Sequence, residues 1–106
     1  MPKYLLETCY TSEGAKGLMK DGGTKRRQAA ERAITSVGAK LEAFYFAFGD
    51  ADAILIVDAA DNATISAASI AVNASGAVTS KTRVLMTPDE VDQAVKKTVS
   101  YTPPGH

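Results

Sequence analysis

The sequence predicts an α+β fold in which one antiparallel sheet carries its helices on one face. Three observations predict this fold. Strand-like and helix-like segments follow one another in the order β-α-β-β-α-β, with one more helix at the end. Within each strand segment, one set of alternating residues is free of charge, as a helix-covered face requires. The chain has 106 residues, the length of one ordinary domain, so we expect a single domain over residues 1–106.

The first half of the chain is expected to hold one strand and a divided helix. Residues 3–10, KYLLETCY, are rich in aromatic and other strand-forming residues. Residues 11–13 start a helix, which Gly22-Gly23 interrupts. A second helical segment begins with Thr24 as its cap and ends at Gly38. Its apolar residues have the spacing of one helix face: Ala30, Ala33, Ile34 and Val37.

The second half begins with an expected hairpin. Residues 41–48 and 53–57 are its strands, and Gly-Asp-Ala-Asp at 49–52 is its turn. Asp61-Asn62 then caps an alanine-rich helix that runs to about Asn73, and the fourth strand is expected at 78–86.

A last helix is expected over residues 88–100. In Thr87-Pro88-Asp89-Glu90 the threonine can cap, the proline suits the first helical position, and the glutamate can close a capping box. The tail from Thr102 to His106 contains two prolines and cannot be helical. The complete order is the ferredoxin-like pattern, in which helices cover one face of an antiparallel sheet.

The two faces of this sheet are expected to differ. One set of alternating residues, which includes Leu6, Tyr45 and Leu55, is uncharged and suits the helix-covered face. The other set holds most strand charges together with large apolar residues, which a soluble monomer rarely leaves open. We therefore expect a second copy to cover it in a homodimer or higher homo-oligomer, or else helix 88–100 to fold back over it. The expected interface residues are Phe44, Phe46, Phe48, Ile54 and Ile56.

Nearly the whole chain resembles the GYD-domain family of small bacterial and archaeal proteins. The similarity is carried by KYLLETCYT at the start, by the Gly-Gly-Thr-x-Arg-Arg segment, by EAFYFAFGD at 42–50 and by the late TPDEVDQAVKK. Gly49 and Asp52 match the motif that names the family, whereas Ala51 stands where the family usually has tyrosine. The resemblance implies a ferredoxin-like fold of the dimeric α+β barrel type. It supplies no function, because this fold is shared by enzymes and binding modules.

The first candidate site is an anion site at the break between the two helical segments. Two glycines before a helix start expose backbone N–H groups, and the helix dipole favours negative charge there. The following basic residues add donors, and the GxxxxGK[ST] spacing of a P-loop is absent. The alternative is a simple helix break whose arginines pair with Glu31 or with solvent. The residues concerned are Gly22, Gly23, Thr24, Lys25, Arg26 and Arg27.

Two further groups of residues are candidates. Glu7, Lys81 and Arg83 fall on the open face, where they form either a polar pocket inside a dimer or an ion-pair cluster between subunits. Asp50 and Asp52 flank the hairpin turn and are close enough to bind a metal, but aspartate is also a common turn residue. The turn interpretation is favoured, so no metal site is predicted.

Catalytic chemistry has little support in this sequence. Cys9 is the single cysteine, so it forms no intramolecular disulfide, and no Cys/His spacing suggests zinc. His106 is the only histidine and lies in the terminal tail, which leaves no nucleophile–histidine pair. Acid–base chemistry by Glu7, Tyr10 or an aspartate stays open. No cofactor is predicted.

Charge and hydropathy limit which cellular location and which kinds of binding partner are expected. Twelve basic residues balance twelve acidic ones, so a general nucleic-acid binder is not expected. No apolar run approaches the length of a membrane span, and we expect a cytoplasmic protein without membrane contacts. The favoured hypothesis is a homo-oligomeric binding or regulatory module for an anionic or partly apolar metabolite. A cofactor-independent isomerase or oxygenase and a structural assembly unit are the alternatives.

Overall fold

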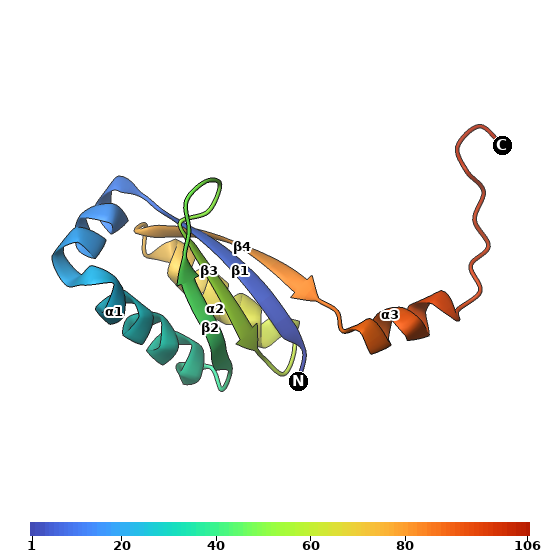
Figure 1. Ribbon diagram of the computed structural model, residues 1–106, viewed down its shortest axis with the longest axis horizontal. Helices are drawn as coiled ribbons and strands as arrows, with labels where there is room; N and C mark the ends of the chain where they lie inside the picture. Colours follow the sequence, from blue (N-terminus) through green and yellow to red (C-terminus); the bar gives the residue numbers. More distant parts are fainter.

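The computed structural model describes all 106 residues as an α+β fold with one four-stranded antiparallel sheet (Figure 1). The predicted fold class and element order are confirmed. The strands are β1 (Lys3–Tyr10), β2 (Lys40–Phe46), β3 (Ala53–Asp58) and β4 (Val78–Leu85). The helices are α1 (Ser12–Ser36), α2 (Asn62–Ala74) and α3 (Pro88–Val95).

The strands lie side by side in the order β2-β3-β1-β4, which is the ferredoxin-like arrangement. β1 is central and pairs antiparallel with both β3 and β4, while β2 is an edge strand on β3. Helices α1 and α2 both cover one face of this sheet, and the other face carries no element of the chain (Figure 1). We call the second face the open face.

The hydrophobic core lies between the sheet and these two helices. Tyr4, Leu6 and Leu55 point from the central strands toward buried Ile34 of α1 and Ile65 of α2. The alternation of buried and half-buried residues along β1 and β3 confirms the predicted inward face of these two strands.

Helix α1 is bent where the sequence predicts its interruption. Gly22 has φ 79° and ψ 171°, which lies outside the helical region and is open to glycine without a steric penalty. The two predicted helical segments are therefore one bent element. Its N-cap is Thr11, whose Oγ1 accepts a hydrogen bond from the Gly14 N–H at 3.2 Å. Because Gly22 is the only non-helical residue inside α1, Thr24 lies within the helix, and the expected cap there is wrong.

A β-bulge in β2 changes which of its side chains face the helices. Leu41 pairs with Val57, but the next paired residue is Ala43, opposite Ile56. The extra residue reverses the alternation beyond this point, because side chains alternate with a period of two. The helix-covered position predicted for Tyr45 is wrong, and this side chain is 70% exposed on the open face.

The same bulge moves two of the expected interface residues to the helix side. Phe44 pairs with Leu55 and Phe46 with Ala53, and both partners belong to the core. The two phenyl rings meet edge to face with centroids 5.1 Å apart. The assignment of Phe44 and Phe46 to the open face is therefore wrong. Phe48 lies beyond the end of β2, in the exposed hairpin loop.

The C-terminal part of the chain projects away from the rest of the molecule (Figure 1). We call residues 86–106 the C-terminal arm. The predicted capping box is present: Thr87 Oγ1 accepts from the Glu90 N–H, and Glu90 Oε1 accepts from the Thr87 N–H, both at 3.1 Å. Helix α3 ends at Val95, earlier than expected. Because the arm points away from the sheet, the alternative in which it folds back over the open face is wrong.

Candidate functional site

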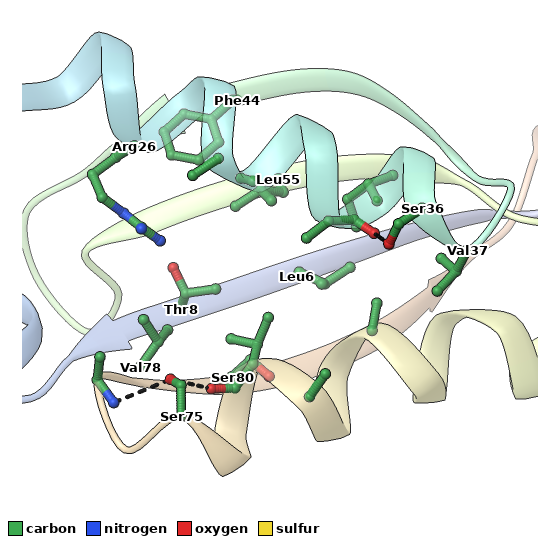
Figure 2. A pocket seen from close by; sticks show the side chains of 18 of the residues that line it. Leu6, Thr8, Arg26, Ser36, Val37, Phe44, Leu55, Ser75, Val78 and Ser80 are labelled. Carbon is green, nitrogen blue, oxygen red and sulfur yellow. Dashed lines mark hydrogen bonds between the residues drawn. The ribbon is translucent and has the colours of Figure 1, made fainter.

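A groove of about 450 Å³ opens between α1 and α2, with the sheet as its floor (Figure 2). Fifteen of its twenty lining residues are hydrophobic. Leu6 and Thr8 of β1 form the floor together with Leu55 of β3, and Phe44 closes the side toward β2. The groove falls within the size range of small-molecule sites, about 300–1,000 Å³.

The groove exists because the two helices present small side chains to each other. Alanine occupies the facing positions on both helices, and a methyl group is too short to fill the space between two backbones. These residues are Ala29, Ala30 and Ala33 on α1, and Ala67, Ala68 and Ala71 on α2. A row of leucines at these positions would close the groove, so the small side chains are necessary for its volume.

Arg26 is the only charged residue that lines the groove. Its side chain extends from α1 over β1 toward Thr8 (Figure 2). Its Nε is shielded from solvent and has no hydrogen-bond partner, and its guanidinium lies 6.0 Å from the Tyr10 ring centroid. The guanidinium is therefore the one group in the groove with the charge to hold an anion.

The predicted anion site at the helix break is not brought together around one point. Successive helical residues point about 100° apart, so Lys25, Arg26 and Arg27 leave the helix in three different directions. Gly22 and Thr24 are exposed beside them. Arg27 pairs with Glu31 at 3.6 Å, as the alternative interpretation expected. Of this set, only Arg26 reaches a cavity; the ligand-binding role of the others stays a prediction.

The charged residues predicted for the open face do lie together. Glu7 Oε1 forms an ion pair with Arg83 Nε at 3.0 Å, and Lys81 lies opposite Glu7 in the β1–β4 pairing. With Cys9 and Asp50 they line a shallow hollow of about 420 Å³ that has one hydrophobic lining residue. The Glu7–Arg83 pair satisfies both charges within one chain, and the pocket or intersubunit role stays a prediction.

The two aspartates of the hairpin loop have different surroundings. Asp52 Oδ2 accepts a hydrogen bond from the Tyr10 N–H at 2.9 Å, and its own N–H donates to the Thr8 carbonyl at 2.8 Å. Asp52 therefore fastens the loop to β1. The Asp50 carbonyl accepts a bond from Cys9 Sγ at 3.1 Å. No group of three or more His, Cys, Asp or Glu side chains is placed to hold a metal ion.

A second ion cluster, absent from the sequence-based candidates, lies at the other end of the open face. Lys3 Nζ contacts Glu42 at 2.6 Å and Asp58 at 2.8 Å. The hydrogen bond from Lys3 lowers the pKa of Asp58 below its ordinary value, and the same bond raises the pKa of Lys3. Alternation along β2 and β3 already places Glu42 and Asp58 on the open face, but the sequence does not show that both carboxylates meet Lys3.

The groove itself was also missed by the sequence-based analysis. Its one available signal was the alanine content of α2, ATISAASIAVNA, together with the Ala-Ala pair at 29–30. Small residues on two facing helices either let the helices touch or leave a space, and the sequence does not distinguish these outcomes.

No helix of the structure has both the length and the apolar content needed to cross a membrane.

Comparison with known proteins gives one result that bears on this site. Searches of curated proteins and of solved structures found no significant match to the chain. The family model of the GYD domain matches residues 4–95, which include the sheet apart from Lys3, both core helices and every residue of the groove. The chain therefore belongs to the GYD-domain family.

Proposed function

We propose that the chain is a binding module for a small elongated molecule with an apolar body and an anionic end, held in the groove between α1 and α2. The observation that carries this proposal is Arg26, the one charged side chain in an otherwise apolar groove. A carboxylate or phosphate oxygen would complete the hydrogen bonding of this guanidinium. The alanine and leucine walls would contact the apolar body.

The chemistry of the lining residues supports binding rather than turnover. Apart from Arg26, the polar side chains in the groove are the hydroxyls of Thr8, Tyr10 and three serines. Ser75 and Ser36 already bond to backbone carbonyls, and no histidine, cysteine or carboxylate lines the groove. General acid–base catalysis most often uses a histidine or a carboxylate, and neither lines this groove.

The test is a titration of the purified protein with decanoate, decyl phosphate and the neutral decanol, followed by calorimetry and by thermal shift. We expect both anions to bind more tightly than decanol by roughly tenfold to a hundredfold, because a hydrogen bond to a charged group contributes about 1.5–3 kcal/mol. Arg26→Ala should remove this preference and leave the decanol affinity unchanged.

Arg27→Ala is the matched control, because it removes the same charge from the neighbouring position outside the groove. It should leave the preference for anions intact. Equal affinity of the wild-type protein for decanoate and decanol would overturn the role of Arg26. If none of the three compounds bound, the groove would not be a site for this class of molecule.

A further inference from the structure

The C-terminal arm contains a well-formed helix with nothing to pack against. Every residue from Met86 to His106 is exposed. The eight residues of α3 are fewer than the roughly twelve to fifteen that an isolated helix needs to be stable in water. Its capping box and first-position proline favour the helix locally. Such a helix is retained when its apolar side has a surface to contact.

The apolar side of α3 is defined by Val91 and Val95, which are one turn apart and 45% and 75% exposed. Val84 and Met86, at the junction with β4, are 62% and 56% exposed. The opposite side of the helix is polar and includes Gln93. The arm therefore presents an apolar side from Met86 to Val95.

The exposed area and the radius of gyration of the chain are larger than those of a compact monomer, which indicates that a large surface lacks a partner. A compact monomer of this mass exposes about 5,700 Å², whereas this chain exposes 7433 Å². Its radius of gyration is 16.9 Å, compared with about 13 Å for a compact chain of this length. The excess area is about twice the roughly 800 Å² that each partner buries in a standard interface.

The open face is complementary to the arm in its apolar character and in its charge. Its centre is apolar and half-exposed, with Leu5, Ile54 and Ile56, and Tyr45 stands beside them. Lys40 and Lys81 on this face have no ion-pair partner within the chain. Helix α3 itself carries three acidic residues, and the basic residues of the arm, Lys96 and Lys97, follow its end, so the charge of the helix is opposite to that of these free lysines.

The connection between β4 and α3 directs the arm away from its own sheet. Only Met86 and Thr87 separate the two elements. Thr87 is extended, with φ −77° and ψ 159°, as a residue before proline prefers. A two-residue link held in this way continues outward from the sheet edge, where a second molecule can receive it (Figure 1).

We propose that the arm of each chain docks on the open face of a second copy, in a reciprocal dimer. A two-fold axis lets both chains contribute the same two surfaces, so one interface covers both arms and both open faces. Val91 and Val95 of one chain contact the apolar centre of the partner's open face. This inference is independent of ligand binding in the groove, which lies on the other side of the sheet.

The first test measures the mass of the full chain in solution by sedimentation equilibrium. We expect the wild-type protein to be a dimer of its 11.1 kDa chain. The double variant Val91→Asp/Val95→Asp should raise the dissociation constant by about a hundredfold or more, because it places two charges in an apolar contact. Gln93→Asp adds a charge on the opposite side of the same helix and should keep the dimer.

Both valines are exposed within the chain, so the variants should keep the thermal unfolding of the sheet and core helices. A wild-type protein that stays monomeric at high concentration would overturn the proposal. A double variant with the wild-type dissociation constant would overturn the role of the arm.

The second test asks whose open face receives the arm. A photoreactive benzoylphenylalanine replaces Val95, and chains labelled with nitrogen-15 are mixed with unlabelled chains before irradiation. We expect cross-links between labelled and unlabelled chains, at peptides that carry Tyr45, Ile54 or Ile56. Cross-links found only within one chain would show that the arm returns to its own sheet, and would refute the exchange.

Discussion

Arg26 and Arg27 are adjacent and carry the same charge, yet their surroundings give them different roles. Arg27 pairs with Glu31 across one helical turn, with both side chains nearly half exposed. Such a pair contributes only about 0.3–0.5 kcal/mol. Arg26 points into an apolar groove and has a shielded Nε without a partner. A functional difference between these two arginines therefore depends on the direction of each side chain.

The ion cluster of Lys3, Glu42 and Asp58 predicts how stability depends on pH. The folded-state pKa of Asp58 is lowered, mainly by the hydrogen bond from Lys3. A lowered carboxyl pKa contributes stability that is present above the unfolded value of 3.8 and is lost as the pH falls through the folded value. We expect the melting temperature to fall below about pH 5, and to fall less steeply in Asp58→Asn.

Thermal unfolding followed by circular dichroism between pH 2 and 7 measures this dependence. Asp21→Asn is the control, because it removes a carboxylate that has no ion-pair partner in the structure. It should leave the acid-side slope close to that of the wild-type protein. The prediction for Asp58 fails if both variants have the same slope.

At the level of the elements, two glycines of helix α1, Gly14 and Gly17, are expected to change stability in opposite directions when each is replaced by alanine. A Cβ added at Gly14 would lie 2.0 Å from the Ala77 carbonyl oxygen, whereas one added at Gly17 has open space. Gly17→Ala should stabilise the protein by about 0.5–1 kcal/mol, because alanine loses less backbone entropy in a helix. Gly14→Ala should destabilise it by about 1–3 kcal/mol, because the backbone of one element must shift.

Urea unfolding of the two variants checks this pair under identical conditions. The two substitutions are three residues apart in one helix and add the same methyl group, so each serves as the control for the other. Equal effects of the two would show that α1 and the start of β4 do not approach as closely as the Ala77 contact requires.

The helices and strands also show which structural features could be predicted from sequence patterns and which could not. Strands β1 and β3, the break at Gly22 and the capping box at Thr87 follow from local residue types, and all were predicted. The bulge after Leu41 has no local signature, because Glu42-Ala43 continues an ordinary strand sequence. One inserted residue exchanges the two faces of the remaining strand, so the error for Phe44, Tyr45 and Phe46 has a single cause.

At the scale of the whole molecule, some features of the candidate site were likewise predicted from the sequence and others were not. Arg26 was among the predicted ligand residues, but the groove around it depends on the distance between α1 and α2, which a sequence does not give. The polar cluster of Glu7 and Arg83 was predicted from alternation on β1 and β4, where no bulge intervenes. The placement of site residues could be predicted where strand register is regular. It could not be predicted where the site depends on how elements distant in the sequence pack together.

The two faces of the sheet allow one last comparison, between Tyr45 and its neighbour Phe44. Tyr45 lies on the open face, and Phe44 lines the groove and packs against the core. We expect Tyr45→Glu to weaken the dimer and leave decanoate binding unchanged. Phe44→Ala should keep the dimer but lower stability by about 2–3 kcal/mol, below the loss for a fully buried phenylalanine because Phe44 is only partly buried.

Sedimentation, urea unfolding and decanoate titration of the same two variants separate the possible results. If Phe44→Ala dissociated the dimer and Tyr45→Glu did not, the bulge would be misplaced and the two side chains would have exchanged faces. If Tyr45→Glu abolished decanoate binding as well as the dimer, binding would depend on the assembled interface. The proposal of two separate surfaces requires that Tyr45→Glu leave decanoate binding unchanged and that Phe44→Ala leave the dimer unchanged, since the sheet lies between the groove and the open face.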